Sequence, residues 1–414
     1  MISTDTSSTP TSTRVPTSIV SPAGVERARL QYGNDIVDRV IDGMYETDTA
    51  ADALLEAFAA LPGRTGWQLL DTALTEGLDA VPDAPAELRN FLQPLLTPPA
   101  WVDLDRVDQG AACYWRLGAL VGLSGISTLA SSYQPPAVAL TLTRTGRLEK
   151  MAVRRVDETA DWLLKVTVPG GARPGTEGFA AAVKVRLVHA TIRRHILTGT
   201  DWDTDTLGQP INALHMAMTA TLIFLHIPLH AMRDLGVRFT DDELQALIDQ
   251  WRWIGYLSGA PEHLLPTTAA ELEAFAHVSF DTLATPTDNT RQLIEALVAD
   301  PFGSSRLLPA AWAERLRPRL LPITRYIWTG IAARWMYWYD GGPCPYVAPN
   351  LLTPLVPLLR PAIWIRETAR RAGLLGTDTR IAQGQAALLR RLMNRMHADR
   401  DTVHAEHLTT HHTA

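Results

Sequence analysis

The sequence predicts an all-α protein, and three observations support this. Apolar residues recur three and four positions apart through most of the chain, which is the spacing of amphipathic helices. The residues Thr240-Asp-Asp-Glu243 form a capping box directly before one such segment. Alternation of apolar and polar residues, typical of strands, is scarce, although residues 138–142 or 164–168 could form one short ribbon. Packed helices are therefore the expected architecture.

The first third of the chain is expected to form short helices. Helical spacing covers residues 25–45, 50–60 and 67–78. Five prolines then break the chain into short pieces: Pro82, Pro85, Pro94, Pro98 and Pro99. Residues 101–131 read as a pair of helices rich in small residues, which let neighbouring helices approach closely. A proline pair at 135–136 ends them, and the segment 140–146 ends in a Thr-Gly turn.

Longer helices follow in the rest of the chain. Residues 150–165 read as a helix that the glycine-rich loop 169–175 stops, and residues 176–195 form the next helix. Residues 211–235 form a helix with a kink at Pro228. The remaining expected helices are 244–257, 268–283, 291–299, 309–339, 364–372 and 381–396.

The composition predicts one large domain between two polar ends. Residues 1–23 are rich in Ser, Thr and Pro and are expected to be a disordered lead, whereas residues 24–396 form a single all-α domain. Residues 397–414 are expected to be a disordered tail that holds five histidines; a weak metal-binding tract is the alternative. The two cysteines, Cys113 and Cys344, are expected to be small core residues.

Charge and hydropathy exclude several classes of partner. A net charge of −6 without a long basic run argues against nucleic acid. No clean run of eighteen apolar residues occurs, so we expect no transmembrane segment; residues 222–229 and 351–365 come nearest. The first 22 residues contain no apolar segment of the kind that a secretory signal needs. We therefore expect the protein to be cytoplasmic.

His189 lies at the centre of the segment 176–195, with Arg186 three residues before it and Arg193 four residues after it. On a helix these three side chains share one face, which is otherwise apolar. Two buried guanidinium groups beside an imidazole require an anionic partner. A haem meets this requirement, because its iron takes a neutral imidazole and its propionates accept hydrogen bonds from arginine. The alternative is a core histidine between arginines that reach the surface.

Arg155, Glu158, Thr159 and Trp162 recur at helical spacing on the preceding segment. Opposite a haem, an arginine and a threonine could donate hydrogen bonds to dioxygen, and a carboxylate could transfer a proton. The alternative is an ion pair between Arg155 and Glu158 on a solvated face.

Three further histidines, His215, His226 and His230, lie near one stripe of the predicted helix 211–235. They could form a metal site, support a haem or its ligand, or be core residues with satisfied hydrogen bonds. The pair His226 and His230 lacks the intervening glutamate of the metalloprotease motif, so a zinc hydrolase is not expected.

Four blocks of the sequence stand out in this order: Thr145-Gly-Arg-Leu148, Arg155-x-x-Glu-Thr159, Val185-Arg-Leu-Val-His-Ala-Thr-Ile-Arg193, and Trp251-Arg-Trp-Ile-Gly-Tyr-Leu-Ser-Gly259 continued by Leu264-Leu-Pro266. Together they resemble the catalytic domain of the latex-clearing proteins, or rubber oxygenases. That family also includes a fungal membrane-bound oxygenase of mycophenolic acid biosynthesis. The resemblance spans roughly residues 101–283.

The resemblance implies a globin-like core with additional helices around a haem b. His189 would be the proximal ligand of the iron, Arg186 and Arg193 would lie near the haem, and Arg155 with Thr159 would be distal. Dioxygen would be the co-substrate. In the best-known members the reaction is oxidative cleavage of an isoprenoid double bond.

The sequence also departs from the pattern of this family. Glu158 stands at a distal position that is lysine in some rubber-cleaving members. No carboxylate precedes Thr145 where such members carry a proposed base, so Glu149 and Glu158 are the nearest candidates. Rubber is extracellular, and a smaller apolar substrate suits a chain without an export signal better.

The expected function is thus that of a b-type haem-dependent oxygenase, which uses dioxygen on a small apolar substrate. An isoprenoid or another alkene-containing compound is the expected kind of substrate. The catalytic residues would be Arg155, Glu158 and Thr159. Two alternatives stay open: a haem peroxidase or monooxygenase of secondary metabolism, and a non-catalytic haem or gas-binding protein. The sequence leaves the oligomeric state open.

Overall fold

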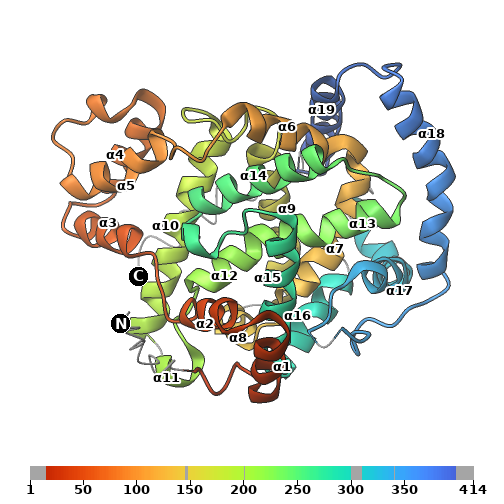
Figure 1. Cartoon of the computed structure of the whole chain (residues 1–414), viewed down its shortest axis with the longest axis horizontal. Helices are drawn as coiled ribbons and strands as arrows, with labels where there is room; N and C mark the ends of the chain where they lie inside the picture. Colours follow the sequence, from red (N-terminus) through yellow and green to blue (C-terminus); the bar gives the residue numbers. More distant parts are fainter. Residues whose placement is uncertain (1–14, 145–147, 200, 300–309, 340, 398–414) are drawn as a thin grey trace, which may run out of the picture.

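The structure, a computed structural model, describes residues 15–144, 148–199, 201–299, 310–339 and 341–397. Within these ranges the chain is all-α, as predicted, and the only extended pairing is one isolated bridge between Val20 and Leu283. Helix α14 (Asp241–Leu257) crosses the middle of the molecule beside α6 (Leu104–Tyr114) (Figure 1). It also packs against the π-helix η3 (Thr219–His226).

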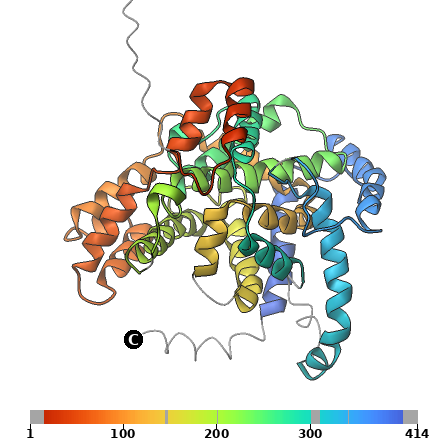
Figure 2. The same cartoon turned by 90° about the horizontal axis from the view of Figure 1, so that it is seen from below.

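Helices near the N-terminus form one end of the molecule. Figures 1 and 2 both place α3 (Thr49–Ala59), α4 (Thr65–Glu76) and α5 (Ala86–Leu96) far from the C-terminal helix α18 (Arg360–Arg371). The predicted helix 25–45 is two helices, α1 (Pro22–Tyr32) and α2 (Asn34–Asp42), because Gly33 between them has a φ of 88°.

Helix α5 corrects the expectation that prolines break residues 82–99 into short pieces. Pro94 lies inside the helix, near its C-terminal end. Leu88, Phe91, Leu92 and Leu95 are almost completely buried on one face, which packs against α3. Burial of this face outweighs the hydrogen bond that Pro94 cannot donate.

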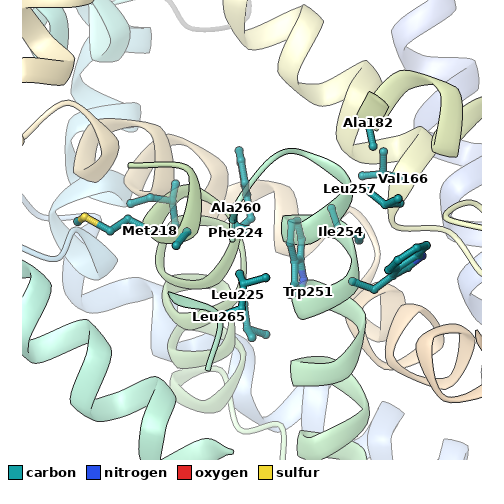
Figure 3. Packing of buried hydrophobic residues seen from close by; sticks show 14 of the residues in the cluster. Val166, Ala182, Met218, Phe224, Leu225, Trp251, Ile254, Leu257, Ala260 and Leu265 are labelled. Carbon is teal, nitrogen blue, oxygen red and sulfur yellow. The ribbon is translucent and has the colours of Figure 1, made fainter. Parts of the chain in front are cut away.

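The middle of the chain supplies most of the core. Its remaining helices are η2 (Trp115–Leu117), α7 (Ala119–Ser132), α8 (Pro136–Arg144), α9 (Leu148–Val166), α10 (Glu177–Gly199), α11 (Thr204–Leu207), α12 (Ala213–Met218), α13 (Ile227–Asp234), η4 (Glu262–Leu264) and α15 (Ala269–Asp281). Trp251 and Trp253 of α14 are fully buried, and the Trp251 ring stacks on Phe224 at 5.6 Å between centroids (Figure 3). This aromatic packing fixes α14 against η3.

Two local predictions about this region have clear outcomes. The capping box is confirmed, because Thr240 accepts a hydrogen bond from the Glu243 amide and the Glu243 side chain accepts one from the Thr240 amide. The short ribbon is wrong, because residues 138–142 lie in α8 and residues 164–166 end α9. Apolar residues in short runs suit a buried helix as well as a strand.

The C-terminal helices are α16 (Asp288–Ala299), α17 (Ala310–Trp335), η6 (Thr353–Leu359), α18 and α19 (Asp378–His397). Asp234, at the end of α13, accepts hydrogen bonds from Arg334 and Trp335 of α17 and from Arg360 of α18. These contacts lower the pKa of Asp234 to about 2, although its burial acts in the opposite direction. Ion pairs thus join the C-terminal helices to the core.

The predicted disordered lead of residues 1–23 needs a correction at its end. Ile19 and Val20 are each 2% exposed, because they pack into the main core beside Leu283. The remaining part, residues 1–14, lies outside the described residues, as do residues 398–414 of the predicted tail. The single-domain boundaries 24–396 stay a prediction. The two cysteines are free and buried.

One stretch of the described chain has the length and hydropathy of a membrane span. It runs over Ala213–Asp234, with a mean hydropathy of 1.3 in its most apolar window, and 89% of that window is buried inside the protein. Burial of this kind is typical of a core helix.

Candidate functional site

Helices α9 and α10 carry the predicted site residues and pack against each other. Their close approach depends on Gly178, where an added Cβ would lie 2.2 Å from the carbonyl oxygen of Lys165. Gly170 and Gly175 in the connecting loop have φ values of 84° and 82°, which favour glycine. The predicted glycine-rich loop thus brings the two helices together.

Neighbouring helices hold this loop in place. Asp108 of α6 accepts hydrogen bonds from the Gly170 amide at 2.7 Å and from Arg173 Nε at 2.8 Å. The indole of Trp253 on α14 donates to the Ala172 carbonyl at 2.8 Å. The relative position of α9 and α10 is therefore set by α6 and α14.

His189 lies half-buried on α10, and its Nδ1 atom is shielded from solvent. Ala182 and Ile196, which the sequence places on the same face, are buried. The face is therefore largely apolar, as predicted, and one imidazole lies within it.

Arg186 and Arg193 have anionic partners in α3 and its N-terminal cap. Arg186 donates two hydrogen bonds to the carboxylate of Asp48, and its guanidinium lies 4.8 Å from the ring centre of Phe91. Arg193 is 3% exposed and pairs with Asp52 at 2.5 Å. Each of the two arginines therefore has an aspartate as an anionic partner: Asp48 for Arg186 and Asp52 for Arg193.

Arg193 has a second role in the local backbone. Its Nη1 atom donates a hydrogen bond to the carbonyl of Ile211 at 3.2 Å. Ile211 has a φ of 51°, which a β-branched residue rarely adopts. Arg193 therefore ties α10 both to α3 and to the strained turn that precedes α12.

The residues predicted on α9 have different environments. Thr159 is half-buried, whereas Glu158 is exposed. The side chains of Arg155 and Glu149 lie outside the part that the structure describes, as does Thr145 of the first sequence block. An exposed carboxylate beside a half-buried hydroxyl gives this end of the α9 face access to water.

The three histidines after α10 separate into two groups. His215 is buried, and this burial lowers its pKa to about 4, as expected for a neutral core histidine. His226 and His230 lie together, with their Nε2 atoms 3.2 Å apart. Their third partner is Glu273 of α15, which lies 2.9 Å from His226 Nε2.

Sequence reasoning missed Glu273, because it lies on a different helix. The only available signal was its spacing of four from His277 within the predicted helix 268–283. That spacing places both side chains on one face, and the structure places His277 against Tyr337, whose ring makes a T-shaped contact with His226.

A cavity of about 500 Å³ lies between α6, α14 and α19. Its lining is acidic and contains Asp105, Asp108, Asp242, Glu243 and Asp378. Cys113 also lines it, and burial raises the pKa of this thiol to about 11. None of its lining residues belongs to the predicted site on α9 and α10.

These observations define a class: an all-α protein in which a histidine-bearing helix packs against a helix with hydroxyl and carboxylate groups. Within this class the chain belongs to the family described as "ER-bound oxygenase mpaB/B'/Rubber oxygenase, catalytic domain", whose model matches residues 112–348. The matched residues include all six predicted site residues.

Two relatives are similar to this chain. A rubber oxygenase from Streptomyces sp. (strain K30) is 25% identical in an alignment of 274 residues, and the match covers 62% of this chain. The match spans 64% of the length of that relative. The solved structure of latex clearing protein LCP in the closed state matches with a TM-score of 0.58 and 20% sequence identity. The match covers 84% of this chain and 91% of the LCP chain. This likeness supports the fold.

Proposed function

We propose that the chain is a haem-dependent oxygenase that uses dioxygen on a small apolar substrate. Its membership of an oxygenase family supports the reaction class. The observation that carries the proposal is His189, a half-buried imidazole on α10, the helix that packs against α9, which carries Thr159. The globin-like character of the core is part of the same proposal.

The donor chemistry of this site fits a haem. An imidazole on a largely apolar face can serve as the proximal ligand of haem iron, and His189 would be that ligand. When bound, haem supplies the dioxygen and one-electron chemistry that side chains lack. Arg186 and Arg193 would support it indirectly, because their pairs with Asp48 and Asp52 fix the position of α10.

The other side chains would act on protons and polar groups. Thr159 can donate a hydrogen bond from its half-buried hydroxyl, and Arg155 would add positive charge one helical turn earlier. Glu158 is exposed, so it can exchange a proton with solvent and pass it toward Thr159.

The proposed substrate is small and apolar, with an alkene or isoprenoid group. The relative named a rubber oxygenase supports this chemistry. Cleavage of a double bond with both oxygen atoms in the product is the proposed outcome.

The cofactor is tested by absorption spectra of the purified full chain before and after dithionite, with a pyridine haemochrome assay. We expect a Soret band and a b-type haemochrome in the wild type, and loss of both in His189→Ala. His195→Ala is the matched control, because His195 is exposed on the same helix. A colourless wild type that haemin cannot reconstitute would overturn the proposal.

The reaction is tested with heavy dioxygen and a panel of apolar alkenes. Two labelled oxygen atoms in the cleaved product support a dioxygenase. One labelled atom indicates a monooxygenase, and turnover only with hydrogen peroxide indicates a peroxidase. Haem binding without any turnover indicates a gas-binding protein.

A further inference from the structure

His226, His230 and Glu273 bring three metal-ligating atoms together, and they lie on elements other than α9 and α10. His226 ends the π-helix η3, His230 lies one turn further in α13, and Glu273 comes from α15. Their ligand atoms lie within 4.8 Å of one another. The closest contacts are 2.9 Å from His226 to Glu273, 3.2 Å between the histidines, and 3.5 Å from His230 to Glu273.

We propose that His226, His230 and Glu273 bind a divalent transition-metal ion of the zinc or iron(II) type. Two imidazoles and one carboxylate form a donor set that such ions accept with an open coordination position. Donors bound to one tetrahedral zinc ion at about 2.0–2.1 Å lie about 3.3–3.4 Å apart. The observed separations are close to these values, so binding requires little movement.

The hydrogen-bond chemistry of His226 supports a cation. Its Nε2 atom faces both a carboxylate oxygen and the Nε2 atom of His230. One ring nitrogen carries either one hydrogen or one lone pair, so without an ion a single hydrogen must be divided between two partners. A metal ion between the three groups accepts a lone pair from each of them.

One cationic side chain also approaches the carboxylate. Arg233 Nη1 lies 3.9 Å from Oε1 of Glu273, which is beyond hydrogen-bond distance. The nearest groups to the Glu273 carboxylate are therefore the two imidazoles, at 2.9 and 3.5 Å.

The backbone explains how the two histidines converge. Four residues are about 40° more than one helical turn, so His226 and His230 lie on the same side. The π register, in which the Ile227 amide donates to Leu222, ends where Pro228 has no N–H to continue it. Ile227, Pro228 and Leu229 separate the histidines, so the site has no adjacent glutamate to act as a general base.

The site is buried on one side and open on the other. The His226 side chain is 3% exposed, whereas those of His230 and Glu273 are 50% and 40% exposed. Tyr337 covers the buried side with its ring edge-on to His226, and its hydroxyl lies 3.1 Å from His277 Nδ1. An ion can therefore enter from solvent and keep one position for water or a small ligand.

The test measures metal content and binding in the full chain after dialysis against chelator. Zinc, iron(II) under anaerobic conditions, and magnesium are titrated separately by calorimetry, and thermal unfolding is followed with each metal. We expect the wild-type protein to bind zinc or iron(II) at one tight site that the Glu273 and His230 variants lack, and to bind no magnesium at that site. Glu273→Gln and His230→Ala should each weaken this site at least about tenfold.

His263→Ala is the control, because His263 is an exposed histidine paired with Glu46. Histidines of residues 397–414 are common to every variant, so their background binding cancels in the comparison. Equal binding by the wild type and both site variants would overturn the proposal, as would magnesium binding equal to that of zinc. Haem content should be unchanged in His230→Ala, and the metal should still bind to His189→Ala, so the two proposals fail separately.

Discussion

Arg186 donates two hydrogen bonds to the carboxylate of Asp48, and the same carboxylate caps α3 by accepting from the Ala51 amide. The side chains of Arg186 and Asp48 are only 14% and 9% exposed. This contact joins the helix of His189 to the N-terminal helices through a largely buried ion pair.

Arg186→Met should therefore destabilise the fold by about 3–5 kcal/mol, because it leaves a buried carboxylate without its partner. Urea unfolding followed by circular dichroism measures this. The control is Lys184→Met on the same helix, whose pair with Asp71 is exposed and should contribute about 0–1 kcal/mol. Equal losses in the two variants would contradict the role given to Arg186.

The double variant Asp48→Asn/Arg186→Met separates the ion pair from the helix cap. Asparagine is also a favourable N-cap residue, so α3 keeps its cap. We expect the double variant to be more stable than Arg186→Met alone, because no unpaired charge remains. If the double variant instead loses as much free energy of unfolding as the two single variants together, the two residues do not interact.

Gly178→Ala should disrupt the approach of α9 and α10. The new Cβ would lie within 2.3 Å of the carbonyl oxygens of Lys165 and Gly171, and backbone cannot move aside easily. We expect destabilisation of about 1–3 kcal/mol and reduced haem content. Gly384→Ala in α19 is the opposite case, because nothing lies within 4 Å, and it should stabilise the protein by about 0.5–1 kcal/mol.

His215 should make stability depend on pH on the acid side. Burial lowers its pKa from 6.5 to about 4, so the unfolded chain binds a proton that the folded protein excludes. The contribution of the neutral His215 ring to the free energy of unfolding is then complete above pH 6.5. It falls as the pH decreases toward 4, by on the order of 3 kcal/mol.

Urea unfolding at a series of pH values measures this effect. His215→Gln should flatten the slope between pH 4 and pH 6.5. The same substitution at the exposed His195 is the control and should keep the slope of the wild type. An unchanged slope in His215→Gln would exclude the buried ring as its source.

Thr159→Val should reduce turnover by on the order of 10²-fold if its hydroxyl stabilises charge in the reaction. Valine keeps the shape of the side chain, so haem content and thermal stability should change little. Thr198→Val is the control, because that exposed hydroxyl bonds only to the backbone of its own helix among the contacts described. Wild-type turnover in Thr159→Val would remove Thr159 from the proposed mechanism.

Local sequence signals predicted much of the fold. The capping box fixed the start of α14, and the glycine-rich loop correctly separated α9 from α10. Pro94 was misleading, because the penalty of a proline in a helix is local whereas the burial that offsets it comes from α3. The ribbon at residues 138–142 failed for a related reason, since short apolar runs do not distinguish a strand from a buried helix.

The site was predictable only where its residues share a helix. Spacing placed Arg186, His189 and Arg193 on one face, but it could not identify Asp48 and Asp52 as partners from a distant segment. In the same way, His226 and His230 were recognised as neighbours, while Glu273 of α15 was not. Contacts between distant segments require the tertiary fold.

The apolar stretch Ala213–Asp234 also limits the order in which the chain can fold. Its cover includes α7, made before it, and α14, α15 and α17, made after it. The end of α17 follows Asp234 by about 100 residues. At about 5–20 residues per second, a ribosome needs about 5–20 s to supply that cover. During those seconds the nascent chain exposes a segment that resembles a membrane span, and synthesis is the stage at which chaperones or the insertion machinery can capture it.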